Sequence, residues 1–123
     1  MASRPYIKRI SILGGEPLAD ENLDDVLTLL NKIRFLFPEK TIWLYSGYTW
    51  KECTLQLGEI VHSHNMQRFK KNLIIEKCDV FVDGRYIDSQ RDISLKWRGS
   101  SNQRVINVQK SLQKGEIVLW ENS

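Results

Sequence analysis

The chain has 123 residues, which is enough for one domain with a buried core, and its 41% hydrophobic and 27% charged residues are typical of globular proteins. This composition excludes a disordered or fibrous chain, and the mild net charge of +3, without zinc-finger or RNA-recognition spacing, gives no indication of a nucleic-acid partner. The apolar runs are far shorter than the roughly 20 residues of a membrane-spanning helix, and no signal-peptide pattern opens the chain. We therefore expect a cytoplasmic protein with no nucleic acid and no membrane among its partners.

The first part of the chain predicts a strand, a helix and a second strand. Residues 6–13 are rich in β-branched side chains and predict a strand. Residues 22–37 predict an amphipathic helix, because Asn22 offers an N-cap and apolar residues then recur at steps of three and four. Pro38 stops this helix, and residues 41–48 predict the second strand.

The middle of the chain predicts two further helices and a third strand. Thr49 and Glu52 have the spacing of a capping box, so a helix is expected from Thr49 to about Ile60. Another helical face follows over residues 66–74, and residues 78–84 predict the third strand.

The tail is less regular. Residues 97–108 predict a loop followed by a short strand, and residues 116–120 predict a last strand. The alternation of strands and helices before the tail builds parallel sheets through right-handed crossovers, so the predicted class is α/β. In such sheets a ligand lies at the carboxyl ends of the strands. Those ends are Gly14-Gly15-Glu16, Ser46-Gly47-Tyr48 and Asp83-Gly84.

The segment Gly14-Gly15-Glu16-Pro17 is the most distinctive of these ends. It lacks the third glycine of a dinucleotide fingerprint, because Leu18 stands there, and the chain contains no Walker GK[ST] sequence. Two glycines expose backbone groups to a ligand, and Glu16 adds an acceptor for an ammonium group. The pattern favours an amino-acid-like headgroup, with a tight turn and a surface glutamate as the alternative.

The cysteines and histidines give no sign of a metal site. Cys53 and Cys78 are the only two cysteines, and they lie 25 positions apart, so they predict reduced packing residues. They cannot supply the three closely spaced thiolates of an iron–sulfur cluster that has one open iron. His62 and His64 predict a solvated surface pair, because no further ligands accompany them.

Four segments, in chain order, resemble one enzyme family. They are ISILGGEPL, FPEKTIWLYSGYTW, CDVFVDGRYI and LKWRGSSNQRVINV. They resemble the activating protein of the anaerobic ribonucleotide reductase, a small radical S-adenosylmethionine (SAM) enzyme, over about residues 10–120 and most weakly over residues 54–72. The resemblance implies that residues 1–123 form a single, partial α/β domain, with a barrel-like parallel (β/α) sheet of the radical SAM type.

The resemblance also implies a set of site residues. In that family the GGEP segment closes around the amino group of the methionine part of SAM. The implied cofactor-binding residues are Gly14, Gly15, Glu16, Pro17, Ser46, Gly47, Tyr48 and Asp83. The late loop is implied to shape the pocket mouth or the docking surface for the reductase, although a core anchor at its tryptophan and a surface salt bridge at its arginine are equally open. It comprises Trp97, Arg98, Gly99, Ser100, Ser101, Asn102 and Gln103.

The sequence departs from the family in one respect. Members carry a CxxxCxxC loop before the GGEP strand, which binds a [4Fe–4S] cluster, and this chain has no such loop. We therefore expect a chain truncated at its N-terminus, with no catalytic or metal-ligating residue of its own and no capacity to hold the cluster alone.

The function that the resemblance implies is generation of the glycyl radical on the large subunit of the reductase, through reductive cleavage of SAM. We expect this chain not to perform it alone. The alternative is a non-catalytic module that binds SAM or docks to the reductase, and an unrelated α/β protein would show no open groove at the strand ends. Because strand 6–13 would lack a neighbour, a homodimer through its edge is a further option.

Overall fold

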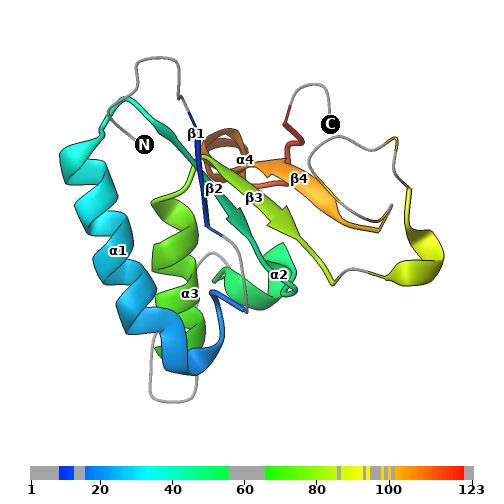
Figure 1. Ribbon diagram of the computed structural model, residues 1–123, viewed down its shortest axis with the longest axis horizontal. Helices are drawn as coiled ribbons and strands as arrows, with labels where there is room; N and C mark the ends of the chain where they lie inside the picture. Colours follow the sequence, from blue (N-terminus) through cyan, green and yellow to red (C-terminus); the bar gives the residue numbers. More distant parts are fainter. Residues whose placement is uncertain are drawn as a thin grey trace.

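The computed structural model describes residues 9–12, 16–55, 66–85, 87–92, 94, 98, 100 and 102–120. Four strands and four α-helices, with two short 3-10 helices, follow one another along these residues (Figure 1). In chain order they are β1 (Arg9–Ile12), η1 (Asp20–Asn22), α1 (Leu23–Leu36), β2 (Thr41–Tyr45), α2 (Trp50–Cys53), α3 (Met66–Glu76), β3 (Val80–Asp83), η3 (Asp88–Gln90), β4 (Arg104–Asn107) and α4 (Val108–Lys114).

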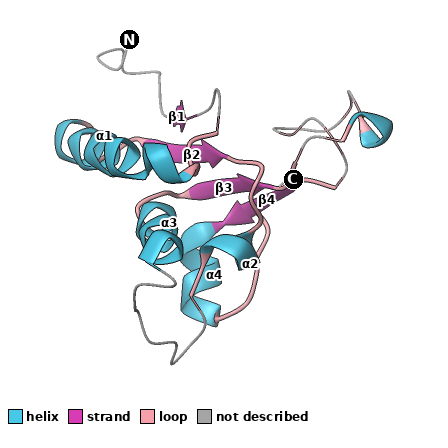
Figure 2. Ribbon diagram, turned by 90° about the horizontal axis from the view of Figure 1, so that it is seen from below, coloured by secondary structure: helices cyan, strands magenta, loops and turns pink. Residues whose placement is uncertain are grey.

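The four strands form one sheet in the order β1-β2-β3-β4. The first three strands are parallel, with Ile10 opposite Ile42 and Leu44 opposite Phe81, whereas β4 runs antiparallel to β3. Helices α1 and α3 lie on the same side of the sheet (Figure 2). The class is therefore α/β, and the described strands form an open sheet.

The parallel sheet predicted for the three strands before the tail is confirmed in β1 to β3, while the direction of the tail strand β4 was not predicted. A parallel neighbour requires a crossover of a dozen or more residues, usually a helix, that carries the chain back to the start of the sheet. Between β3 and β4 the only helix in the described residues is η3, which is three residues long. The chain therefore returns beside β3 in the opposite direction.

Strand alternation buries side chains on both faces of β2 and β3, whereas β1 buries only Ile12. Side chains such as Ile42, Leu44 and Phe81 face α1 and α3 and form the main core with residues of those helices. The side chains between them, Trp43 and Val82, belong to a second cluster on the other face. Strands buried on both faces are typical of parallel sheets, which explains their nearly continuous apolar sequences.

The capping box predicted at Thr49 is present, but the helix that it begins is short. Thr49 Oγ1 accepts a hydrogen bond from Glu52 N, and Glu52 Oε1 accepts one from Thr49 N. Helix α2 nevertheless ends at Cys53, because Thr54 is extended at φ −99° and ψ 152° and its hydroxyl donates back to the carbonyl of Trp50. The predicted continuation to Ile60 is thus wrong at 54–55, and residues 56–60 lie outside the described part.

The tail contains a helix where the sequence predicted none. Asn107 caps α4 by accepting a hydrogen bond from Lys110 N, and Gly115 ends it at φ +73°, a left-handed conformation that favours glycine. The strand predicted at 116–120 is wrong in extent, since only an isolated antiparallel bridge joins Leu119 to Ile106. None of the helices in the residues described here combines the length and apolar character needed to cross a membrane.

Candidate ligand site at the strand ends

The carboxylate of Glu16 joins the ends of β1 and β2. Its Oε2 accepts hydrogen bonds from Leu18 N at 2.9 Å and from Ser46 Oγ at 2.7 Å, and its Oε1 accepts one from Gly47 N at 2.7 Å. Two of these donors belong to the segment after β2, some 30 positions along the chain. Glu16 therefore fixes the relative position of two neighbouring strand ends.

The backbone around Glu16 is compact enough to make Gly47 necessary. The carbonyl of Glu16 accepts hydrogen bonds from Ala19 N at 3.1 Å and from Asn22 Nδ2 at 2.9 Å, and Pro17 is buried. A Cβ added to Gly47 would lie 3.2 Å from Glu16 Oε1, which is closer than ordinary van der Waals contact. A glycine at position 47 thus lets the carboxylate reach the backbone N–H. The predicted site residues Gly14 and Gly15 lie outside the described residues.

The Glu16 carboxylate keeps capacity for one more donor. All three of its hydrogen-bond donors are neutral, and no described Lys or Arg forms an ion pair with it. A carboxylate offers about four lone-pair positions, so one position on Oε1 is left over. The arrangement can accept a hydrogen bond from a ligand ammonium group.

The end of β3 is tied to the same edge through Asp83. Its carboxylate, which is 1% exposed, accepts hydrogen bonds from Trp50 N at 2.9 Å and from Arg104 Nε and Nη2 at 3.0 and 2.6 Å. These bonds to Asp83 raise the pKa of the Arg104 guanidinium above its ordinary value. Gly84 N also donates to the carbonyl of Tyr48 at 3.1 Å. The three parallel strands therefore end along one edge of the sheet. The Asp83 carboxylate at this edge is buried and binds Trp50 and Arg104.

A cavity of about 500 Å³ adjoins this edge. It is lined by Tyr48, Thr49, Lys51, Glu52 and Arg68, so one predicted site residue, Tyr48, contributes to its wall. Two cations and one carboxylate give the lining a net positive charge, which suits a ligand carboxylate. The sequence did not indicate this cavity, because Arg68 comes from α3 and no local pattern connects it to the strand end.

The described residues of the late loop bind the chain's own backbone. Gln103 Nε2 donates to the carbonyl of Gly84 at 3.0 Å, and Asn102 Nδ2 donates to that of Arg85 at 2.8 Å. Ser100 is fully buried, donates to Asn102 Oδ1 and accepts from Ile87 N. These side chains hold the segment after β3 against the start of β4.

The other late-loop residues are less informative. Arg98 Nε is buried and has no hydrogen-bond partner. The predicted site residues Trp97, Gly99 and Ser101 lie outside the described residues.

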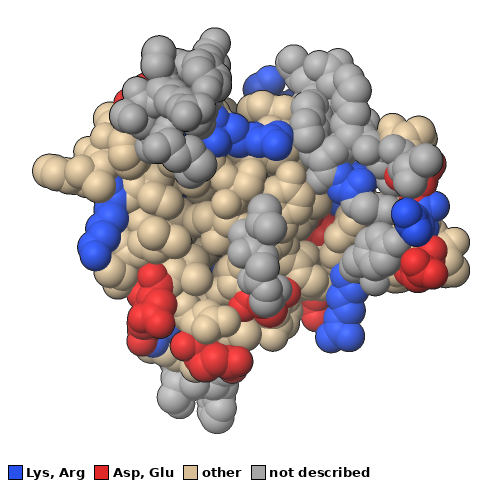
Figure 3. Space-filling view, in the orientation of Figure 1, with Lys and Arg blue, Asp and Glu red and all other residues tan. Residues whose placement is uncertain are grey.

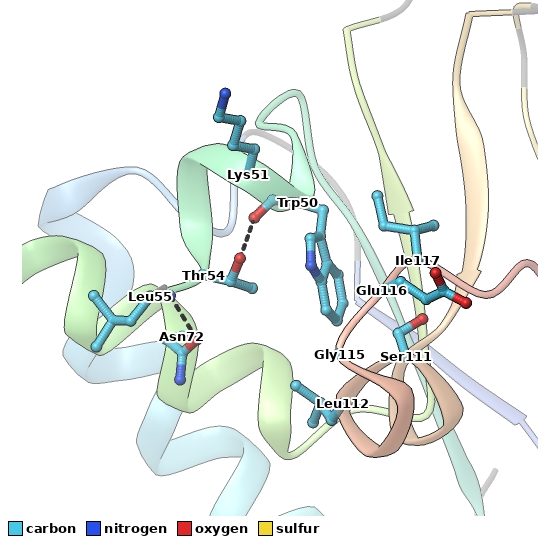
Figure 4. A pocket seen from close by; sticks show the side chains of 10 residues that line it. All are labelled: Trp50, Lys51, Thr54, Leu55, Asn72, Ser111, Leu112, Gly115, Glu116 and Ile117. Carbon is cyan, nitrogen blue, oxygen red and sulfur yellow. Dashed lines mark hydrogen bonds between the residues drawn. The ribbon is translucent and has the colours of Figure 1, made fainter. Parts of the chain in front are cut away.

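A second cavity, of about 460 Å³, lies between α2, α3 and α4 (Figure 4). The Trp50 side chain extends into the space between α2 and the end of α4, where Leu112 and Ile117 lie (Figure 4). Sequence reasoning missed this cavity because it requires α4. The cavity contains none of the predicted site residues, and it lies on the helical side of the strand ends.

The two cysteines do not fit an iron–sulfur cluster, the group that the sequence resemblance implies. Cys53 and Cys78 are fully buried, and burial raises the pKa of each thiol to about 12. Cys78 Sγ donates a hydrogen bond to the carbonyl of Ile74. Across the described residues no three His, Cys, Asp or Glu side chains form a group that could hold a metal ion. A thiolate is the form that ligates iron, so these thiols are packing residues, as their spacing predicted.

Both thiols should resist modification in the folded chain. With pKa values near 12, the thiolate fraction at pH 8 is on the order of 1,000-fold below that of a free cysteine, so reaction with a disulfide reagent should slow accordingly. The folded chain also retains protons that the unfolded chain loses, so the free energy of unfolding should fall as the pH rises from about 9 toward 12. Thiol titration with and without denaturant measures the first effect, and immediate reaction of either native thiol would contradict it.

Comparison with known proteins gives the family. A family model described as a 4Fe-4S single cluster domain matches residues 1–106. The chain is 39% identical over 101 residues to the anaerobic ribonucleoside-triphosphate reductase-activating protein of Escherichia coli (strain K12), which is 80% of this chain and 56% of that protein. The protein of the same name from Enterobacteria phage T4 is 30% identical over 105 residues, or 84% of this chain and 55% of that protein.

The chain spans little more than half the length of these curated relatives. No solved structure gives a significant match. The family model covers most of the residues, including β1 to β3 and all three strand ends. The chain therefore belongs to the family of 4Fe-4S single cluster domains.

Proposed function

We propose that this chain binds SAM at the ends of its parallel strands, as part of an activating protein of the anaerobic ribonucleotide reductase. Curated relatives that match about 80% of the chain carry the name of that activating protein. The observation that carries the proposal is the Glu16 carboxylate, which is held by three neutral donors and forms no ion pair with a described lysine or arginine. The methionyl ammonium of SAM would supply the missing positive charge.

The contacts at the strand ends divide between ligand binding and support. Glu16 accepts from the ammonium through the remaining position on Oε1, and Gly14, Gly15 and Pro17 belong to the same segment. Ser46 and Gly47 hold the Glu16 carboxylate in place, and Tyr48 lines the adjoining cavity. Asp83 supports the site indirectly, because its carboxylate accepts a hydrogen bond from Trp50 N and so fixes the start of α2 to the end of β3.

The full reaction that we propose for the activating protein is reductive cleavage of SAM, which generates a glycyl radical on the large subunit of the reductase. A [4Fe–4S] cluster supplies the electron for such a cleavage. Because neither cysteine of this chain fits the cluster, we assign to these residues the binding of SAM and the contact with the reductase. We propose residues 97–103 for that contact; among them, Ser100, Asn102 and Gln103 form hydrogen bonds with the segment after β3.

The arrangement of strands supports a partial barrel. Strands β1, β2 and β3 are neighbours in chain order, and α1 and α3 both cover the same face (Figure 2). Repetition of this unit, with every helix on one face, curves a sheet toward a (β/α) barrel. We therefore propose that the chain forms part of a barrel-like sheet of the radical SAM type, in a protein of the cytoplasm.

Replacing Glu16 by glutamine tests the site. If the ammonium donates to Glu16, Glu16→Gln should weaken binding of S-adenosylhomocysteine, which keeps the methionyl ammonium, by about 1.5–3 kcal/mol, the range for hydrogen bonds to charged groups. Isothermal titration calorimetry measures the affinity, and thermal unfolding separates loss of the ligand contact from loss of the fold.

Two matched variants complete the Glu16 experiment. Ser46→Ala removes one internal donor but keeps the charge at position 16, so it should bind more tightly than Glu16→Gln. Glu39→Gln changes an exposed glutamate at the opposite end of β2 and should bind as the unsubstituted chain does. Equal affinity of Glu16→Gln and the unsubstituted chain would remove Glu16 from the site.

The cysteine geometry favours a second candidate function, a module without chemistry of its own that binds SAM or docks to the reductase. Incubation with iron and sulfide under anaerobic conditions should then give no stoichiometric cluster, while calorimetry with SAM or capture of the large reductase subunit gives a signal. A stoichiometric cluster with a visible charge-transfer band would contradict the assignment of Cys53 and Cys78 to packing. Sedimentation of the purified chain tests whether it also forms the homodimer that we propose through β1.

A further inference from the structure

Lys71 of α3 is a buried charged residue that contacts the segments after β1 and β2. It is 7% exposed, and its Nζ lies 2.8 Å from Asp20 Oδ1 and 4.9 Å from the centre of the Tyr48 ring. An ammonium group out of water requires compensation, and the carboxylate and the face of the aromatic ring both supply it. Lys71 therefore contacts two segments that the chain separates by 28 positions, one after β1 and one after β2.

Both contacts of Lys71 lead to the Glu16 carboxylate. Asp20 lies four residues after Glu16, in the compact segment that the Glu16 carbonyl organises. Tyr48 follows Gly47, whose N–H donates to Glu16, and Tyr48 N itself donates to Ser46 Oγ. A movement of either segment would change the hydrogen bonds that hold Glu16.

The thiol of Cys53 lies within electrostatic reach of Lys71 and of the strand-end carboxylates. Burial raises the pKa of this thiol most, Lys71 lowers it, and the carboxylates of Glu52, Glu16 and Asp83 raise it further. Asp83 has Arg104 as its cation, whereas Lys71 has Asp20. The buried ammonium group of Lys71 therefore interacts with Asp20 after β1 and with Tyr48 after β2, and is shielded from solvent.

The neighbouring lysine provides a contrast. Lys70 pairs with Asp24 at 3.1 Å, where the Asp24 side chain is 80% exposed, so this ion pair lies on the surface. Acidic side chains gather over η1 and the first turn of α1, at the lower left of Figure 3, where Asp20 and Asp24 lie. The two lysines therefore pair with neighbouring acidic residues, Lys71 with Asp20 as a buried lysine and Lys70 with Asp24 on the surface.

We propose that Lys71 is a positioning residue of the ligand site, which holds the segment after β1 against Tyr48 and so sets the Glu16 carboxylate for a ligand ammonium. This inference rests on the proposed function and names a residue that acts through Asp20 and Tyr48. Lys71 itself contacts protein groups, and the Tyr48 ring that it contacts belongs to the wall of the 500 Å³ cavity.

Three variants test this role, with Lys70→Met as the matched control. Lys71→Met should weaken binding of S-adenosylhomocysteine by about 10-fold and should increase amide hydrogen exchange at Leu18 and Gly47, whose N–H groups donate to Glu16. Lys71→Arg keeps the charge and should restore most of both properties. Lys70→Met should leave both unchanged.

The two readouts separate this inference from the proposed function. If Lys71→Met lowers the melting temperature but changes neither the affinity nor the exchange at Leu18 and Gly47 relative to Lys70→Met, Lys71 is a packing residue and the inference is wrong. If the unsubstituted chain does not bind S-adenosylhomocysteine, the proposed function fails, while the exchange rates still decide whether Lys71 holds the strand ends. If Lys71→Met does not fold, Asp20→Asn takes its place. This substitution keeps the shape of a side chain that is 55% exposed and removes the negative charge that pairs with Lys71. It should increase hydrogen exchange at the amides of Leu18 and Gly47.

Discussion

Replacing Phe81 by alanine should lower the free energy of unfolding by about 3–5 kcal/mol, the range for removing a buried phenylalanine. Phe81 is fully buried on the central strand β3, opposite Leu44 of β2 and Ile106 of β4. The Trp50 ring lies 6.4 Å from it, between centres, so the truncation would leave a cavity that touches three strands and α2. Chemical denaturation measures the effect, and the melting temperature should fall by about 10–20 °C.

Phe35 provides the matched control for Phe81. It lies on the solvent side of α1 and is 85% exposed, so Phe35→Ala should change the free energy of unfolding by less than about 0.5 kcal/mol. If Phe81→Ala does not fold, Phe81→Leu should still fold and be less stable than the unsubstituted chain. Equal stability of the Phe81→Ala and Phe35→Ala variants would contradict the position of β3 in the core.

Replacing Asp83 by asparagine should cost about 2–3 kcal/mol of stability. The substitution keeps the shape of the side chain but removes the charge that compensates Arg104 and places an amide N–H₂ near the donors that the carboxylate accepts. The loss should stay below that of a fully buried pair, because the Arg104 side chain is 40% exposed and water can solvate it. Denaturant unfolding of the variant gives the value.

A double-mutant cycle tests the origin of the Asp83 effect. Arg104→Met alone leaves a carboxylate that is 1% exposed without its cation, so it should also be destabilising, and the double variant should recover more than about 1 kcal/mol of the sum. Asp25→Asn, at an exposed site in the first turn of α1, serves as the control and should remain within about 0.5 kcal/mol. Additive losses would mean that Asp83 and Arg104 act separately.

The local patterns of the sequence predict where the elements lie better than what individual residues do. The helix at 22–37 is confirmed as α1, because its apolar residues follow the helical period. Asn22, however, makes no capping hydrogen bond with its side chain, which instead donates to the carbonyl of Glu16. Helix α4, only seven residues long, was missed because so short a segment shows too few helical repeats to detect.

The site follows the same division. The order of strands and helices was sufficient to predict that residues 14–16, 46–48 and 83–84 lie at one edge. The parallel pairing of β1, β2 and β3 confirms that placement for the described residues Glu16, 46–48 and 83–84. Contacts between distant segments could not be predicted, because they depend on register. The bonds from Ser46 and Gly47 to Glu16, and the pairing of Asp83 with Arg104 across an antiparallel strand, are of this kind. The roles of these residues toward SAM stay predictions.

The reversed direction of β4 determines how the sheet can grow. Beyond β4, the segment around Leu119 already forms backbone hydrogen bonds, from Asn107 N to the carbonyl of Val118 and from Trp120 N to that of Val105. At the other margin, β1 pairs with β2 alone among the strands that the structure describes. A strand that joined beside Arg9–Ile12, from whatever polypeptide, would make this four-residue segment an interior strand and would lie next to the Glu16 end of the site.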